Sequence, residues 1–394
     1  MKLEDVCELI VDCPHSTAND EGNGFPLIRT PNIGKGRLIL EGVHRVSQEV
    51  YDKRNLRAVP QDDDLIFARE APAGNVAVIK NGEKVCLGQR TVLLRPNKAL
   101  VNPDFLAYYL LSPQQQYGLL GTANGATVAH VNIPTIRNLK IDVPDLDKQV
   151  KIAGIISAYD NLIENNQKQI KLLEEAAQRL YKEWFVDLRF PGYETTPVVD
   201  GVPEGWKWTQ LADIAAVNKR SISKDYSFEY IDYIDIGSVS AGRIESKTRY
   251  MLKDAPGRAK RVVCDGDVIW GMVRPNLKSY ALVFHPQDTT IASTGFAVLS
   301  AKKVPFSFLY CHVIQDEFIS YLVNCTNGAA YPAVKPIHFE EANILVPTNS
   351  LLEKFQALAE PMFRKIEVLS KQIEVAAEAR DRLLPKLMSG ELEV

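Results

Sequence analysis

The sequence lacks the cysteine, histidine and apolar patterns that mark several common classes of protein. Its cysteines are Cys7, Cys13, Cys86, Cys264, Cys311 and Cys325, and its histidines are His15, His44, His130, His285, His312 and His338. No two cysteines form a CxxC pair, and no histidines show metal-ligand spacing. The chain also has no apolar run of about 18 residues, the length that a membrane helix needs. We therefore expect free, mostly buried thiols, no zinc site and no membrane span.

The chain also lacks an excess of positive charge. Its 46 lysines and arginines are outnumbered by 49 aspartates and glutamates, which gives a formal net charge of −3. Proteins that bind nucleic acid are usually basic overall, because they contact phosphates. A nucleic-acid function would therefore depend on local basic patches or on partners. The acidic start of the chain lacks an apolar signal region, so we expect a cytoplasmic protein.

Sequence motifs of common catalytic sites are missing as well. The segment Gly34-Lys35-Gly36 does not have the spacing of a phosphate-binding loop, and no Gly-x-Ser-x-Gly elbow occurs. The Asn-Pro-Pro-aromatic tetrapeptide of amino-methyltransferases is also absent. The acids of 144–148 lie where a helix is expected to begin, and acids there stabilise a helix by capping it. We expect no catalytic residue and no bound metal or cofactor in this chain.

What the chain does contain is an internal repeat of about 200 residues. The stretch 124–144, NGATVAHVNIPTIRNLKIDVP, aligns without a gap with 327–347, NGAAYPAVKPIHFEEANILVP, at an offset of 203. The same offset places 64–67 (DLIF) on 267–270 (DVIW) and continues downstream of both stretches. A repeat of this length indicates a duplicated domain and predicts approximate two-fold symmetry within one chain.

Each copy ends in a stretch with heptad spacing. Apolar residues recur at a and d positions over five heptads, which makes a helix of roughly 50 Å. One apolar seam needs a partner, so we expect the two long helices to pack antiparallel against each other. Asn166 and Arg380 interrupt the seam, which favours a device that fixes register or solvated ends of the seam, with a partner-binding role as the alternative. The expected helix-pair core residues are Ile156, Ile163, Ile170, Leu173, Leu180, Met362, Ile366, Leu369, Ile373 and Leu383.

Both globular modules mix short β-type runs with turns and a helix, so we expect an α+β fold. Strands are predicted at 76–79 and 91–94, and a helix is predicted over 105–111 with a cap at Asn102-Pro103. The prolines and glycines of 191–205 predict a linker. The predicted divisions are a first module at 1–145, a helical spacer at 146–190, a linker at 191–205, a second module at 206–347 and a C-terminal helical spacer at 348–394.

Basic residues gather at matching places in both copies, which favours phosphate contact over a merely solvated surface. Base recognition needs side chains that offer two hydrogen-bonding groups, such as Arg, Asn and Gln. The DNA-binding candidates of the first module are Lys35, Arg37, Arg69, Gln89, Arg90, Asn124 and Asn132. Those of the second module are Arg243, Lys247, Arg274, Asn276, Lys278, Asn327, Tyr331 and Lys335.

Several segments resemble the specificity subunits of type I restriction-modification systems, the HsdS family. The stretch 149–174, QVKIAGIISAYDNLIENNQKQIKLLE, is similar to their central helical region. The stretch 202–211, VPEGWKWTQL, resembles the entry to their second target-recognition domain. The stretch 383–392, LLPKLMSGEL, resembles their C-terminal end, and 64–67 and 87–91 resemble parts of their recognition domains.

The resemblance implies two target-recognition domains separated by two long antiparallel coiled-coil helices, in a subunit that performs no chemistry. Each domain would bind one half of a split, asymmetric site in double-stranded DNA, and the helices would fix the spacer between the halves. Two modification (methyltransferase) subunits and restriction (translocase and nuclease) subunits would be the partners. These partners, and not this chain, would bind S-adenosylmethionine and ATP.

Two other functions fit parts of the sequence. A coiled-coil adaptor with two protein-binding modules would show no sequence-dependent DNA binding. A nuclease or methyltransferase acting alone would show turnover without partners, and the missing motifs argue against it.

Overall fold

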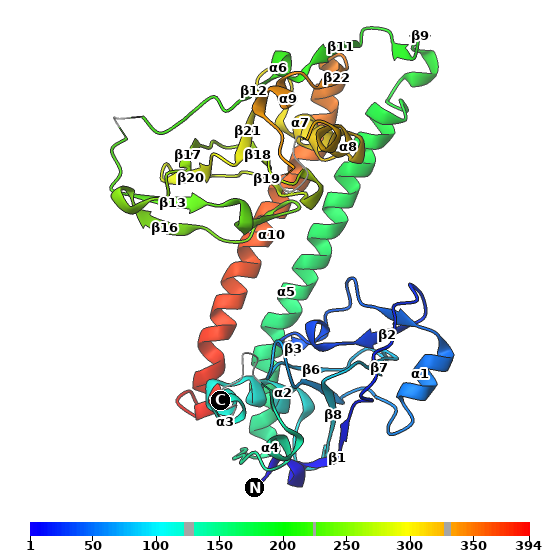
Figure 1. Cartoon of the computed structure of the whole chain (residues 1–394), viewed down its shortest axis with the longest axis vertical. Coiled ribbons are helices and arrows are strands. Elements are labelled where there is room, and N and C mark those ends of the chain that lie inside the picture. Colours follow the sequence, from blue (N-terminus) through cyan, green and yellow to red (C-terminus); the bar gives the residue numbers. More distant parts are fainter. Residues whose placement is uncertain (122–129, 224–225, 327–331) are drawn as a thin grey trace. The chain divides into compact units, whose positions relative to one another are not determined.

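The computed structural model describes residues 1–121, 130–223, 226–326 and 332–394 (Figure 1). The chain divides into two compact units. Unit 1 spans Met1–Asn165 and Gln372–Val394, and unit 2 spans Asn166–Lys371. Each unit therefore combines one globular module with parts of both long helices. The candidates Asn124, Asn327 and Tyr331 lie outside the described residues.

Unit 1 is built on a five-stranded sheet with strand order β1-β8-β5-β6-β3 and a three-stranded sheet with order β4-β2-β7. Its strands are β1 (Cys7–Asp12), β2 (Phe25–Ile28), β3 (Gly36–Arg37), β4 (Arg45–Val46), β5 (Leu65–Ala68), β6 (Val76–Val78), β7 (Cys86–Leu87) and β8 (Thr91–Pro96). Its shorter helices are α1 (Gln48–Arg54), α2 (Pro103–Leu111), α3 (Pro113–Leu120) and α4 (Ile133–Arg137). The strands predicted at 76–79 and 91–94 are confirmed as β6 and β8.

Helix α2 begins as the sequence predicts. The side chain of Asn102 accepts a hydrogen bond from the backbone N–H of Phe105 at 2.9 Å, and Pro103 occupies the first helical position. The helix places Phe105 and Leu106 in one core with Leu65 and Phe67 of the sheet. This packing joins α2 to the strands whose ends carry several of the candidate residues.

Unit 2 repeats this plan with two four-stranded sheets, ordered β12-β21-β18-β19 and β16-β13-β20-β17, and three two-stranded ribbons. Its strands are β9 (Val198–Val199), β10 (Val202–Pro203), β11 (Lys207–Gln210), β12 (Ala215–Val217), β13 (Tyr230–Ile234), β14 (Val239–Ser240), β15 (Arg243–Ile244), β16 (Thr248–Met251), β17 (Ala259–Val262), β18 (Val268–Gly271), β19 (Tyr280–Leu282), β20 (Thr290–Ser293), β21 (Phe296–Ala301) and β22 (Asn343–Val346). Its shorter helices are α6 (Leu211–Ile214), α7 (Phe306–Val313), α8 (Asp316–Asn324) and α9 (Pro336–Glu340).

The strand registers show that the two units are copies. Leu65 of β5 pairs with Leu94 of β8, and Val268 of β18 pairs with Leu299 of β21. The parallel pairing of β2 with β7 recurs as the parallel pairing of β13 with β20. Because the same strands pair in the same directions, the sequence repeat is a repeat of structure, and the α+β class is confirmed.

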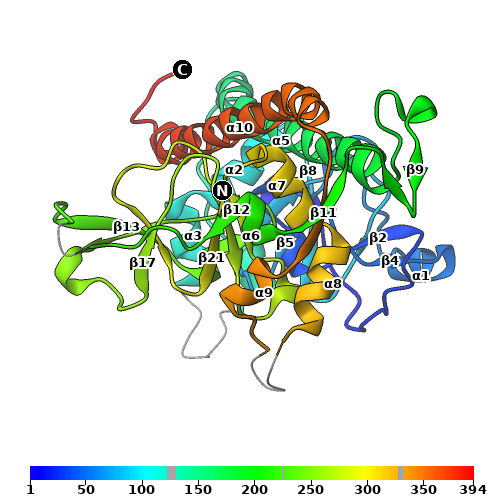
Figure 2. The same ribbon diagram turned by 90° about the horizontal axis from the view of Figure 1, so that it is seen from above.

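The long helices are α5 (Leu146–Tyr181) and α10 (Asn349–Ser389), and a π-helical turn (Lys182–Val186) follows α5. In unit 1 the first part of α5 shares a core with the end of α10, and in unit 2 the last part of α5 shares a core with the start of α10. The helices are therefore antiparallel, and they run side by side in each unit (Figures 1 and 2). Of the ten expected core residues, Ile156, Ile170 and Leu369 are buried and the other seven are half-buried.

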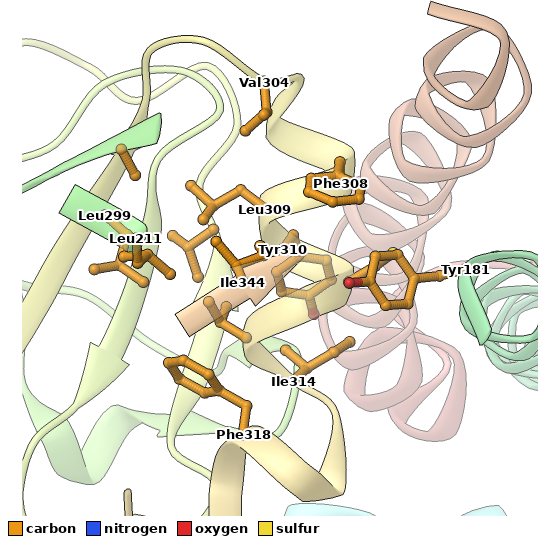
Figure 3. Close-up of a cluster of buried hydrophobic side chains, with 14 of the residues drawn as sticks. Tyr181, Leu211, Leu299, Val304, Phe308, Leu309, Tyr310, Ile314, Phe318 and Ile344 are labelled. Carbon is orange, nitrogen blue, oxygen red and sulfur yellow. The ribbon is translucent and has the colours of Figure 1, made fainter. Parts of the chain in front are cut away.

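The core of unit 2 joins α5 to α7 through aromatic side chains. Tyr181 of α5 reaches toward α7, where its ring lies 5.5 Å from that of Phe308 (Figure 3). Its hydroxyl is 3.0 Å from Nδ1 of His312, and Nε2 of His312 is buried with no hydrogen-bond partner among the described residues. Burial lowers the pKa of His312 to about 4 from its usual 6.5, so the ring is neutral in the folded unit.

Replacing His312 by glutamine is expected to make unit 2 less sensitive to acid. Between pH 6.5 and about 4 the unfolded chain binds a proton at His312 that the folded unit does not bind. Stability therefore falls with decreasing pH in this window, by roughly 3 kcal/mol, and the glutamine variant should lose that dependence. Urea unfolding followed by tryptophan fluorescence measures this effect, because Trp184, Trp206, Trp208 and Trp270 all lie in unit 2. The matched control is the exposed His285, whose replacement by glutamine should leave this loss of stability in place.

Candidate nucleic-acid interface

Three separate segments of unit 1 meet where its central strands end. Arg69 and Glu70 follow β5, Gln89 and Arg90 form the turn between β7 and β8, and His130 precedes α4. Backbone hydrogen bonds join the segments, because the Arg69 N–H donates to the Arg90 carbonyl and the Val131 N–H donates to the Arg69 carbonyl, both at 2.9 Å. The sheet thus brings together residues that lie up to about 60 positions apart in the sequence.

The side chains of these segments form one network, which we call the polar edge. Its members are Asp12, His15, Arg69, Glu70, Gln89, Arg90 and His130. At its centre Arg69 binds Asp12 at 3.1 Å, donates from Nε to the Val131 carbonyl at 3.0 Å and lies 2.9 Å from Nε2 of His130. With a side chain only 11% exposed, Arg69 holds the segments together from within.

The outer part of the polar edge faces solvent. Glu70 lies 2.6 Å from His130 and 2.6 Å from Arg90, and the Arg90 side chain is 60% exposed. His15 lies 3.1 Å from Asp12 and is 69% exposed, and its carbonyl accepts a hydrogen bond from Gln89 at 3.2 Å. The two arginines balance the two carboxylates. The surface therefore offers donors and acceptors in fixed positions with little net charge, which suits contact with base edges better than contact with phosphates.

A buried arginine that the sequence gave no reason to single out supports the polar edge from behind. Arg54 of α1 donates to the carbonyls of Leu87, Ser16 and Pro14 at 2.6, 3.0 and 3.4 Å. These bonds fix both the segment that carries His15 and the strand that precedes Gln89. No local sequence pattern indicates this role, because the carbonyl partners of Arg54 lie 33 to 40 residues away in the chain.

The equivalent edge of unit 2 keeps the backbone and changes the side chains. The Met272 N–H donates to the Gly295 carbonyl, and the Val334 N–H donates to the Met272 carbonyl, both at 2.9 Å. Met272 therefore stands where unit 1 has Arg69, and Gly295 stands where it has Arg90. The two units present the same frame with different hydrogen-bonding groups.

The candidates of unit 2 lie beside this edge. Arg274 and Lys278 flank a 3₁₀ turn (Pro275–Leu277) with left-handed φ values of 51° and 55°, and this turn carries the exposed Asn276. The Arg274 N–H donates to the Pro332 carbonyl at 2.7 Å, and Lys278 pairs with Asp316 at 3.0 Å. The exposed Lys335 follows Val334, so these four candidates lie on two neighbouring segments.

The remaining candidates are dispersed. Asn132 is exposed and immediately follows the polar-edge segment at Val131. Arg37 donates to Asp104 at 3.1 Å and to Asn161 of α5 at 3.4 Å, which favours a structural role for it. Lys35, Arg243 and Lys247 are exposed and lie outside the polar edge and its counterpart in unit 2.

The second copy has a cluster of basic residues over 243–261, which are Arg243, Lys247, Arg249, Lys253, Arg258, Lys260 and Arg261. Lys247, Arg258 and Lys260 are exposed and form no ion pair within the described part of the chain. Arg249 differs, because it pairs with Asp232 at 2.8 Å and lies 4.2 Å from the centre of the Tyr230 ring. The sequence cluster thus separates into unpaired cations and one that stabilises the sheet.

The described residues offer neither a cluster of metal-binding side chains nor a membrane-spanning helix. They hold no group of three or more His, Cys, Asp or Glu side chains that could bind a metal ion. No helix in the described ranges is long and apolar enough to cross a membrane.

Comparison with known proteins gave a consistent set of similarities. Residues 1–175 match the family model described as the type I restriction modification DNA specificity domain. The chain is 28% identical to the type I restriction enzyme MjaIX specificity subunit of Methanocaldococcus jannaschii, over 100% of this chain and 93% of that one. It is 21% identical to the HindI specificity subunit of Haemophilus influenzae, over 84% and 86% of the two chains.

A solved structure has the same fold. The chain superimposes on the S subunit of a type I restriction-modification system from M. genitalium with a TM-score of 0.61. That similarity covers 98% of this chain and 95% of the other, at 15% sequence identity. The two modules and the long helices therefore form a known arrangement of elements.

Proposed function

We propose a function on the premise that the chain belongs to the HsdS family, the DNA specificity subunits of type I restriction-modification systems. The chain binds double-stranded DNA at a split, asymmetric site, and each unit recognises one half of that site. It positions two modification (methyltransferase) subunits and the restriction (translocase and nuclease) subunits in the cytoplasm. In this proposal the partners bind S-adenosylmethionine and ATP and perform the chemistry.

The observation that carries this proposal is the pair of equivalent edges with unlike side chains. Arg69 and Arg90 of unit 1 correspond to Met272 and Gly295 of unit 2, on the same backbone hydrogen bonds. Equivalent backbone hydrogen bonds would let the two units bind DNA in the same orientation. Different side-chain donors and acceptors would let them recognise two different base sequences. Lys247, Arg258 and Lys260, which form no ion pair with the residues that the structure describes, would contact phosphates and add affinity without adding sequence preference.

Mapping methylated bases in a host that carries this chain with its modification subunits tests the proposal. The expected result is one methylated motif with two specified halves and an unspecified spacer. Active modification subunits that methylate no such split motif would refute the proposal. They would favour an adaptor that binds only proteins.

Replacing Arg90 by alanine is expected to relax the specificity of one half-site. The guanidinium is exposed and, within the described ranges, is paired with Glu70 alone, so the free energy of unfolding should change by less than about 0.5 kcal/mol. Loss of a contact that donates two hydrogen bonds to a base should reduce discrimination at one position by about 5- to 150-fold. Competition binding with duplexes altered one base pair at a time measures this.

Two matched variants sharpen the Arg90 experiment. Arg90→Lys keeps the charge but not the planar fork, so it should resemble the alanine variant. Lys98→Ala removes an exposed cation that pairs with Asp63 outside the polar edge, and it should leave discrimination unchanged. A uniform loss of affinity for every sequence in Arg90→Ala would instead assign Arg90 to a phosphate.

A further inference from the structure

Unit 2 contains an apolar pocket that plays no part in the proposed contacts with DNA. It has a volume of about 490 Å³ and lies among the end of α5, β11, α8 and β22. Its apolar lining includes Phe185, Val186, Trp208, Phe318 and Leu345. This volume is sufficient for one or two large side chains of another molecule.

The mouth of the pocket exposes large apolar side chains. Trp208 is 62% exposed and Val186 is 44% exposed. An exposed tryptophan beside an apolar pocket is typical of a protein–protein contact, because buried aromatic anchors contribute most of the binding energy there. Such exposure costs free energy in the isolated chain, and a partner that covers it would recover that cost.

The equivalent place in unit 1 shows that the fold does not require this apolar character. At the offset of 203, His312, Phe318 and Leu345 correspond to Tyr109, Gln115 and Asp142. These three residues of unit 1 also line a pocket, of about 600 Å³, together with Lys2 and Lys140. The two copies thus keep a hollow at the same position, one apolar and the other polar.

Charge at the rim of the apolar pocket indicates what kind of segment would fit. Glu317 and Glu341 line it, both are exposed, and neither forms an ion pair with any described residue. Among the described residues, no lysine or arginine lines this pocket. An apolar side chain flanked by basic residues would therefore match both the floor and the rim.

We propose that the apolar pocket of unit 2 anchors a large apolar side chain, flanked by lysine or arginine, from a modification subunit. This inference rests on the proposed function, which supplies two such subunits. Because unit 1 has a polar hollow at the equivalent place, it lacks this anchor. The two modification subunits therefore bind the chain unequally, and the copy on unit 2 binds more tightly.

Titration of the purified full-length chain with purified modification subunit, followed by native mass spectrometry, tests this. Two binding steps of different affinity are expected for the wild type. Trp208→Ala removes the exposed aromatic lining, and Leu345→Asp introduces the carboxylate that unit 1 has at this position. Both should weaken the tighter step by at least about tenfold and leave the weaker step unchanged.

Controls distinguish loss of binding at the pocket from unfolding of unit 2 and from a failure of the proposed function. Fluorescence of the buried Trp270 reports whether unit 2 of each variant is folded. Asp142→Leu, the reciprocal change in unit 1, should leave the tighter step unchanged. Unaltered binding in both pocket variants, or equal weakening of both steps, would overturn the inference. In either case, a split methylated motif in the wild type would still support the proposed function, because that result does not depend on the pocket.

Discussion

Replacing Asp160 by alanine is expected to destabilise unit 1 by about 3 kcal/mol, because it removes the buried carboxylate that pairs with the half-buried Arg380 and leaves only the exposed Asp381 as its ion-pair partner. Asp160 on α5 is 5% exposed. Its carboxylate accepts hydrogen bonds from Arg380 of α10 at 2.7 Å and from the Tyr108 hydroxyl of α2 at 2.5 Å. This cluster joins both long helices to the globular module.

The protonation states of the cluster explain the size of the expected effect. Burial and the neighbouring Asp160 raise the pKa of Tyr108, so the phenol remains a neutral donor. Burial alone would lower the pKa of Arg380, but Asp160 and Asp381 hold it above its ordinary value. Arg380 thus stays charged, and removal of Asp160 leaves that half-buried charge with Asp381 alone as a partner.

The apolar residues that unit 2 has at the equivalent positions suggest a control variant. At the equivalent positions unit 2 has Phe363 and Ala177 in place of Asp160 and Arg380, and Phe363 packs edge-on against Tyr310 at 5.3 Å. An apolar triple variant, Asp160→Leu, Arg380→Met and Tyr108→Phe, should therefore recover more than half of the lost stability. Asp381→Ala, which removes an exposed partner of Arg380, should cost less than about 0.5 kcal/mol.

Hydrogen exchange of α2 and urea unfolding followed by circular dichroism measure the stability of unit 1. Tryptophan fluorescence should hardly change in the Asp160 variant, because every tryptophan lies in unit 2. An Asp160→Ala variant as stable as the wild type would show that the cluster does not hold the helices to the module.

Lengthening both long helices by one heptad is expected to lengthen the unspecified spacer of the DNA site and to leave both half-sites unchanged. The two units divide at Asn165/Asn166 in α5 and at Lys371/Gln372 in α10. Seven residues inserted at each point preserve the a and d register and add about 10 Å of helix. At 3.4 Å per base pair this corresponds to about three base pairs.

The heptad experiment has an internal control in the antiparallel pairing. An insertion into α5 alone shifts its seam against α10, so this variant should lose stability and DNA binding together. Methylated-motif mapping of the double insertion gives the result. An unchanged spacer, or a changed half-site, would contradict the idea that the helices set the distance between the two half-sites.

The sequence was sufficient to predict the fold class because its two strongest signals are regular. A repeat at constant offset and a heptad pattern depend only on residue type and spacing, and neither requires knowledge of distant contacts. The structure confirms two α+β copies and two antiparallel helices. It also gives a cause for one break in the heptad seam, because Arg380 is half-buried and paired with Asp160.

The arrangement of the candidate site was harder to predict because tertiary contacts determine it. Arg69 is 57 residues from Asp12 and 62 from Val131, so no local pattern shows that its side chain is engaged by both. The sequence candidate after β18 was Arg274, whereas backbone hydrogen bonds make Met272 the counterpart of Arg69. The assignment of individual residues to base contacts stays a prediction.

The most direct test of the central claim, that each unit reads its own half of one site, is a binding measurement on scrambled duplexes. The complex of this chain with its modification subunits is titrated onto the mapped motif and onto duplexes with one half scrambled. Scrambling either half should weaken binding at least about tenfold. In the Arg90→Ala variant, the loss of affinity caused by scrambling should become smaller for one half of the site, the half that unit 1 recognises, and should stay the same for the other half. Equal affinity for all duplexes, or loss of sensitivity to both halves in that variant, would contradict the claim.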